Sequence, residues 1–99
     1  MRKMKLCRFD EMNPADDLKT DEDIALYLNE ALKYDDPNIL QAAMRDIARA
    51  KGMTSIAEKS GISREALYRA LRENSRPEFN TVFQVLKAFG LRLRVEIAP

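Results

Sequence analysis

A glycine between two short amphipathic segments constrains this chain more than any other feature. Gly61 lies four residues after Ala57 and six residues before Leu67. A glycine can adopt the positive φ that a tight turn between two helices requires, and a small alanine lets the second helix cross over the first. Residues 53–71 are therefore predicted to form two helices that turn one apolar side toward a core. That apolar side consists of Ile56, Ala57, Ile62, Leu67 and Leu71.

The opposite side of the second predicted helix is polar and contains arginine. Its residues are Ser63, Arg64, Glu65, Tyr68 and Arg69. A helix whose apolar side is fixed and whose arginine-bearing side faces outward can enter the major groove of DNA. The motif therefore predicts a DNA-binding protein.

Length and composition limit the alternatives. A chain of 99 residues with 45% hydrophobic residues suits one small domain. No apolar run approaches the roughly 18 residues of a membrane span, and the first ten residues are too charged for a secretory signal, so we expect a cytoplasmic protein. Cys7 is the only cysteine and histidine is absent, which excludes an internal disulfide and the usual zinc ligand sets. We expect no metal, no cofactor and no enzymatic activity.

The charge is unevenly distributed along the chain. Residues 1–36 carry six Lys and Arg against ten Asp and Glu, a balance of −4, whereas residues 37–99 carry eleven against six, a balance of +5. The basic part suits phosphate binding and the acidic part does not. This asymmetry suggests two different partners.

Two helices are predicted ahead of the motif. Thr20 and Asp23 resemble a capping box, and the acidic first turn suits the helix dipole. Asp36 and Pro37 have the residue types of an N-cap and a first helical position, and Gly52 is a suitable C-terminal cap. The two predicted helices cover residues 21–34 and 37–51.

The remaining helices follow from similar signals. Thr54 and Ser63 are predicted to cap the two motif helices. After a polar loop, a last helix is predicted to begin at Asn80 or Thr81 and to be closed by Gly90. The result is a mainly α fold of five helices.

Both ends of the chain have strand-like patterns. Residues 4–9 alternate partly and could form an edge strand or an ordered arm. Residues 91–97 alternate strictly between apolar and charged side chains, which predicts a strand. A lone strand needs a backbone neighbour, which could be residues 4–9, a partner protein or the same strand of a second copy. We favour a symmetric homodimer, whose apolar dimerisation residues are Leu91, Leu93, Val95 and Ile97.

The chain is thus predicted to have three parts. Residues 1–19 form an arm, strand or loop, residues 20–91 form the helical domain with the motif at 53–72, and residues 92–99 form the terminal strand.

The motif has a resemblance to known proteins. Residues 53–71 resemble the helix-turn-helix of the Cro and lambda-repressor-like superfamily. The longer run from Ala57 to Val95, with its SREALYRAL, PEFNT and KAFGLRLRV segments, is similar to HigA-like antitoxins, the antidote proteins of addiction modules. The resemblance covers roughly residues 20–97. One difference is Met53, where relatives of the lambda repressor often carry a phosphate-clamping glutamine.

The resemblance implies a double function. A HigA-like antitoxin neutralises a cognate toxin, commonly a small basic RelE-like ribonuclease, and represses its own operon by binding operator DNA. It implies that α-helical residues of the motif read base edges and that neighbouring residues contact phosphates. The residues that the resemblance implies as contacts to double-stranded DNA are Thr54, Ser63, Arg64, Glu65, Tyr68, Arg69, Ser75 and Arg76.

Structural roles remain alternatives for these residues. Arg64 and Arg69 could be solvated or paired with Glu65 or Glu73 at helical spacing. Tyr68 could be half-buried by packing, and Ser63 and Thr54 could act only as helix caps. The acidic run from residue 16 to residue 23 could dock on a basic toxin or simply favour a helix start.

Two other functions fit the sequence. One is a freestanding phage-type transcriptional repressor without a toxin partner. The other is a toxin-binding protein whose helix-turn-helix has lost DNA binding. DNA binding whose affinity falls steeply with salt would support the antitoxin or the freestanding repressor and argue against a protein that has lost DNA binding.

Overall fold

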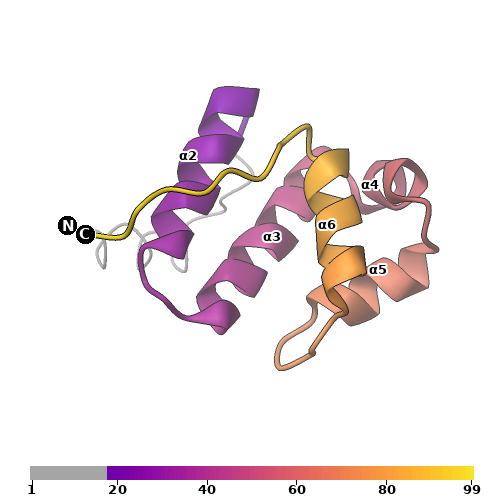
Figure 1. The fold of residues 1–99 in the computed structure, drawn as a ribbon. Helices are drawn as coiled ribbons and strands as arrows, with labels where there is room; N and C mark the ends of the chain where they lie inside the picture. Colours follow the sequence, from indigo (N-terminus) through magenta and orange to yellow (C-terminus); the bar gives the residue numbers. More distant parts are fainter. Residues whose placement is uncertain (1–17) are drawn as a thin grey trace.

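The structure, a computed structural model, describes residues 18–99. This part of the chain contains five helices and no strand, as Figure 1 shows. The predicted strand at residues 4–9 lies outside the described residues. The helices are α2 (Asp21–Leu32), α3 (Pro37–Lys51), α4 (Met53–Ser60), α5 (Arg64–Leu71) and α6 (Phe79–Ala88).

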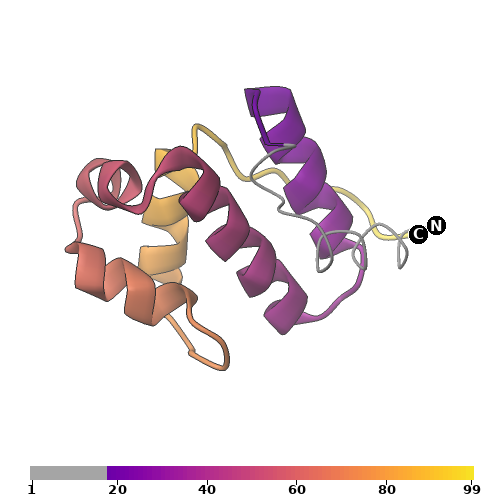
Figure 2. The ribbon, with the colours of Figure 1, turned by 180° about the vertical axis from the view of Figure 1, so that it is seen from behind.

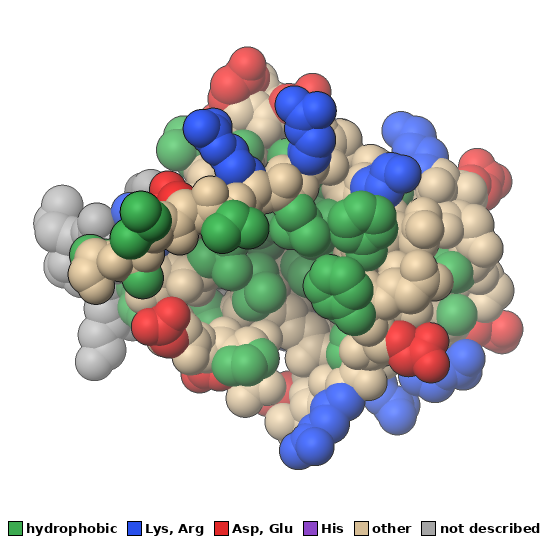
Figure 3. Space-filling view, viewed as in Figure 1, with side chains coloured by type: hydrophobic (Ala, Val, Ile, Leu, Met, Phe, Trp, Pro, Cys, Tyr) green, Lys and Arg blue, Asp and Glu red, His purple; other side chains and the backbone are tan. Residues whose placement is uncertain are grey.

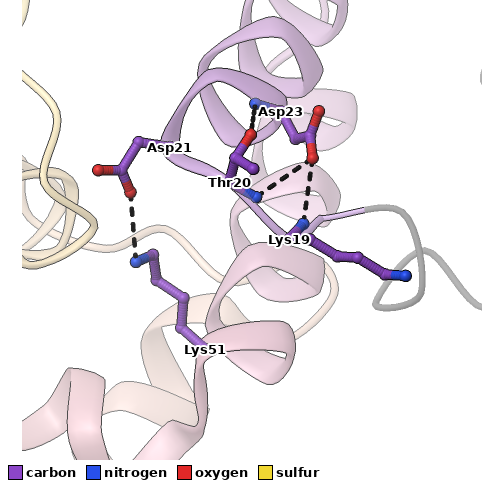
Figure 4. A network of polar contacts seen from close by, with 5 residues as sticks. All are labelled: Lys19, Thr20, Asp21, Asp23 and Lys51. Carbon is purple, nitrogen blue, oxygen red and sulfur yellow. Dashed lines mark hydrogen bonds and ion pairs between the residues drawn. The ribbon is translucent and has the colours of Figure 1, made fainter.

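The start of α2 is held by the predicted capping box. The Thr20 hydroxyl accepts a hydrogen bond from the Asp23 backbone N–H at 3.1 Å, and the Asp23 carboxylate accepts from the Thr20 N–H at 3.2 Å. Figure 4 shows this network and the ion pair, 3.8 Å long, that joins Asp21 to Lys51 at the end of α3. The helix ends at Leu32, two residues earlier than predicted, because the chain turns through a positive φ of 54° at Asp35.

Helix α3 has the predicted bounds and lies between its neighbours. The Asp36 side chain accepts from the Asn38 N–H at 2.9 Å, Pro37 occupies the first turn, and Gly52 ends the helix with φ 99°. The helix packs against α2, α4 and α5, while α4 packs against α6. On the α2 side, the Tyr27 hydroxyl donates to Asp46 at 2.5 Å. Helices α3 and α4 therefore each pack against three others in the described chain, with α4 also contacting α5.

The core receives side chains from all five helices. Helix α2 contributes Ile24 and Ala31, and the largest fully buried side chains come from the other four helices and from Phe89, the C-cap of α6. These are Ile47, Ile56, Leu67, Val85 and Phe89. Burial of such side chains stabilises the folded chain by about 1.5–3 kcal/mol each. The apolar positions at helical spacing are therefore core positions, as the sequence indicates.

Helix α6 begins slightly earlier than predicted. Its first residue is Phe79, with Glu78 as an N-cap that makes no side-chain hydrogen bond. At its end, Gly90 has φ 88° and donates its N–H to the Lys87 carbonyl at 2.9 Å. The predicted glycine closure is confirmed.

The predicted C-terminal strand does not form in the described part of the chain. Residues 91–99 have no regular secondary structure and pass over α2 in Figure 1. The prediction of a strand within this fold is wrong for a physical reason. All regular elements from residue 18 onward are helices, so no extended neighbour offers its backbone donors and acceptors.

Apolar surface gathers on the face that carries this tail and α6. Figure 3 shows hydrophobic side chains across the middle of that face. Phe79 and Phe83 are both exposed, with ring centroids 6.1 Å apart, and the Lys87 ammonium lies 5.7 Å from the Phe83 centroid. Exposed apolar patches of this kind commonly mark contact surfaces for other proteins.

Candidate nucleic-acid interface

The turn between α4 and α5 depends on Gly61. Its φ of 76° and ψ of 22° are left-handed, and its N–H donates to the Glu58 carbonyl at 3.2 Å. The Ile62 N–H then donates to the Ala57 carbonyl at 3.2 Å. These bonds satisfy carbonyls at the end of α4 and set the direction in which α5 begins.

Helix α5 is oriented by its cap and its buried side. The Ser63 hydroxyl accepts from the Ala66 N–H at 3.0 Å, which confirms the predicted cap. Leu67 is fully buried and Leu71 is 2% exposed, so this side faces the core. The opposite side consists of the exposed residues Ser63, Arg64, Glu65, Tyr68, Arg69 and Arg72. The structure thus brings every α5 residue singled out in the sequence onto one open surface.

Two of these residues form a pair. The Arg64 guanidinium donates to the Tyr68 hydroxyl at 3.2 Å, and its central carbon lies 5.4 Å from the centroid of the Tyr68 ring. Tyr68 is 45% exposed, so its ring lies on the surface under the guanidinium rather than in the core. Within residues 18–99, neither Arg64 nor Arg69 forms an ion pair with a glutamate. The pair places an aromatic ring and a positive charge next to each other on the exposed side of α5.

Thr54 does not cap α4, contrary to the prediction. The helix begins at Met53, and its N-cap is Gly52, which makes no side-chain hydrogen bond. The positive φ of Gly52 ends α3 and starts α4 at one residue, leaving no room for a cap at residue 54. Thr54 is exposed in the first turn of α4, while Met53 is buried in the core. The N-terminal amides of α4 are therefore not occupied by a capping side chain.

The loop after α5 gives its two candidate residues different environments. The Ser75 hydroxyl donates to the Ala70 carbonyl at 2.6 Å and accepts from the Gln41 amide at 2.7 Å. Ser75 therefore has a structural role that the sequence did not reveal. Arg76 is exposed on the same loop.

Arginines line a shallow groove beside α5. The groove has a volume of about 520 Å³, and Arg69, Arg72 and Arg76 are among its lining residues. Arg72 was not among the residues predicted from the motif, because it follows the last helical residue, where a side chain's direction depends on the C-cap. Three guanidinium groups on one groove favour binding of an anion such as a phosphate. Glu78 also lines this groove and limits its positive charge.

Comparison with known proteins identifies the family. The family model described as probable addiction module antidote protein matches residues 8–97. The chain belongs to this family of antidotes. The antidote chain is also 44% identical over 86 residues to an uncharacterised protein of Haemophilus influenzae, an alignment that covers 87% of this chain and 89% of the relative. No solved structure matches the chain. An antidote acts on a cognate toxin, so a toxin is one partner of this protein.

Two residues of the antidote that support α5 were missed in the sequence. From α3, the Gln41 amide donates to the Ala70 carbonyl at 2.9 Å, and the Arg45 guanidinium donates to the Leu71 carbonyl at 2.9 Å. They satisfy carbonyls at the end of α5 that the helix itself leaves free. In the sequence, the sign of this role is that Gln41 and Arg45 are polar residues four positions apart, next to the apolar positions of α3.

Neither a metal site nor a membrane segment is found in the described chain. Between residues 18 and 99, no three His, Cys, Asp or Glu side chains are grouped so that they could hold a metal ion. No helix in that part of the antidote has the length and apolar character needed to cross a membrane.

Proposed function

We propose that this antidote neutralises a small RelE-like ribonuclease toxin and represses its own operon by binding operator DNA through α4 and α5. It acts in the cytoplasm by binding and not by catalysis. The toxin partner follows from the family, whereas the class of toxin, the repression and the DNA binding are our inference.

The exposed side of α5 is the observation that supports DNA binding most strongly. Leu67 and Leu71 fix one side of the helix in the core, which leaves Arg64 and Arg69 free to approach base edges. We assign α4 and α5 to a lambda-repressor-like helix-turn-helix with α5 as its recognition helix. Arginine can bind guanine O6 and N7 through two hydrogen bonds, which gives about 1–3 kcal/mol of discrimination per pair.

Other residues would position the protein on the DNA backbone. Thr54 lies at the start of α4, where backbone amides and the helix dipole favour a phosphate. Arg72 and Arg76 lie on the groove beside α5 and would bind phosphates of the same strand. Glu65 lies at the first turn of α5, where it would accept from a cytosine amino group. Ser75 contributes by holding the loop in place.

The charge distribution supports two different partners. The basic part of the chain contains α5, while the acidic start of α2 lies in the part with a balance of −4. We propose that this acidic part contributes to binding a basic ribonuclease. We also propose that the antidote is a homodimer paired through its C-terminal tail.

Neutralisation is tested with the product of the reading frame next to that of the antidote. Co-expression of both proteins and purification through a tag on the antidote should recover a complex, and the antidote should inhibit RNA cleavage by the partner. A neighbouring product that neither binds the antidote nor cleaves RNA would contradict the proposed toxin.

Repression is tested with a reporter gene placed behind the DNA upstream of the antidote's own reading frame. The antidote should lower reporter expression, and Arg64→Ala combined with Arg69→Ala should relieve this repression. Lys33→Ala combined with Arg49→Ala is a matched control, because it also removes two exposed cations, both of which lie outside α4 and α5. Equal repression by the α5 variant and the control would contradict the proposal.

A further inference from the structure

The C-terminal tail is fixed at its root and open beyond it. The Leu91 N–H donates to the Leu86 carbonyl at 3.1 Å, and its side chain packs against the core. Farther along, Val95 is 94% exposed and Ile97 is 96% exposed. Within residues 18–99, the backbone of residues 92–99 forms no hydrogen bond with any other part. A partner that pairs with this tail would therefore be held in a defined position relative to the body.

The alternation of the tail limits how it can pair with a second copy. In a symmetric antiparallel pair, directly opposed residues lie on the same face. An apolar residue must therefore oppose an apolar one, and a charged residue a charged one, because a shift by one residue would mix the two faces. The possible symmetric registers of the two tails differ only in which residue lies on the two-fold axis.

The charges distinguish these registers. Centring the pair on Leu93 places Arg92 opposite Arg94, and centring it on Arg94 places that arginine opposite itself. Centring on Glu96 places two glutamates opposite each other. Like charges in direct opposition are destabilising. Centring on Val95 avoids all of them, because Arg94 of each copy then faces Glu96 of the other and Arg92 faces Ala98. Centring on Ile97 also avoids them, but it pairs only residues 95–99 and forms no ion pair.

We propose that two copies of the chain pair their tails as antiparallel strands with Val95 on the two-fold axis. Two Arg94–Glu96 ion pairs then lie on one face of the ribbon, and Leu93 opposes Ile97 on the other. The body end of each tail is anchored by Leu91, so the ribbon fixes how the two bodies face each other. The partner copy supplies the backbone neighbour that the described chain lacks.

The location of the tail leaves the DNA-facing side open. In Figure 1 and in the opposite view of Figure 2, the C-terminus and α5 lie toward opposite ends of the molecule. Pairing through the tail would therefore keep α5 of both copies accessible. The inference rests on the homodimer proposed above and specifies its register, but it does not depend on DNA binding.

Cysteine cross-linking tests the register in the full-length protein. In a Cys7→Ser background, Val95→Cys should form a disulfide with its own copy, because directly opposed Cβ atoms lie within about 5.5 Å. Arg94→Cys should cross-link much more slowly, and Ala98→Cys is the control for random encounters, since it is equally exposed but far from its symmetry mate. Fastest cross-linking at position 94, or equal rates at all three positions, would overturn the proposed register.

A charge exchange tests the ion pairs without cysteine. Arg94→Glu and Glu96→Arg should each raise the dimer dissociation constant roughly tenfold in sedimentation, and the double variant should restore it. Rescue by Arg92→Glu with Glu96→Arg instead would indicate a pair centred on Arg94 and would overturn the inference. A wild-type protein that stays monomeric would overturn the homodimer as well, whereas a dimer without operator binding would contradict only the proposed repression.

Discussion

At the scale of single residues, Gly61 is the position where the backbone alone decides the structure. Its φ of 76° is left-handed, and a Cβ atom added there would meet nothing within 4 Å. The cost of a substitution at this position is therefore conformational and not steric. Asparagine tolerates the left-handed region better than other residues with a side chain.

This reasoning predicts a graded series at residue 61. Gly61→Ala should lower the free energy of unfolding by about 1–2 kcal/mol, Gly61→Val by more, and Gly61→Asn by less than either. Urea denaturation followed by circular dichroism measures these differences. A Gly61→Val variant as stable as the wild type would show that the left-handed turn is not required.

Arg69 is the residue whose role in base recognition can be tested most specifically. Arg69→Ala should weaken binding to the antidote's own upstream DNA by about 1–3 kcal/mol and relax the preference for one base in each half-site. Competition binding with single-base variants of the DNA measures both effects, with Lys33→Ala as the control. An unchanged base preference would remove Arg69 from the reading residues.

Several single residues could be predicted from the sequence, and others could not. The exposed side of α5 was predictable because Leu67 and Leu71 fix its orientation. The predicted helix cap at Thr54 was wrong, because a positive φ at Gly52 allows one residue to end α3 and begin α4. The hydrogen bonds of Ser75 depend on Gln41, a residue far away in the sequence.

At the scale of elements, α5 depends on α3 for its position. Gln41 and Arg45 donate to carbonyls at the end of α5, so a neighbouring helix holds α5 on the side away from its exposed arginines. A hydrogen bond from a charged donor contributes about 1.5–3 kcal/mol to stability. Loss of either contact should therefore affect both the stability of the fold and the geometry of α5.

Arg45→Met tests this support, because methionine keeps much of the apolar stem while losing the guanidinium. The variant should lose about 1.5–3 kcal/mol of unfolding free energy and bind operator DNA more weakly. Thermal unfolding and DNA titration measure the two effects. Arg49→Met on the same helix is the control, since Arg49 is exposed. Equal stability of the two variants would contradict the role of Arg45.

The elements themselves were largely predictable. Their caps and apolar spacing located all five helices to within about two residues, because each signal acts within a few residues of the chain. The tail was different. Its alternating pattern was read as a strand, but a strand needs a neighbour, and the described part of the chain supplies none. In the homodimer proposed above, the second copy would supply this neighbour.

At the scale of the whole molecule, the antidote has separate surface regions of different chemical character. The face of α5 carries exposed arginines, the start of α2 is acidic, and the tail runs from α6 across α2 to a C-terminus that lies away from α5. The described chain carries its exposed helix-turn-helix arginines on a single helix, α5, so one copy offers one such surface. Operator recognition through two half-sites therefore requires the second copy.

This arrangement predicts the layout of the operator. Two half-sites should lie about 34 Å apart, one helical turn, or at a multiple of that distance. Footprinting of the upstream DNA should reveal two protected segments on the same side of the duplex, and insertion of about 5 base pairs between them should abolish cooperative binding. Protection of a single segment that tolerates such insertions would contradict dimeric recognition.

The central claim is that α5 of this antidote forms its DNA-binding surface, and salt-dependent binding tests it most directly. Wild-type protein and the Arg64→Ala, Arg69→Ala double variant should be titrated onto the upstream DNA at increasing salt, after circular dichroism shows that both are folded. We predict that wild-type affinity falls linearly with the logarithm of salt concentration and that the double variant binds at least about tenfold more weakly at every concentration. Equal affinity of the two proteins, or no salt dependence, would contradict the claim.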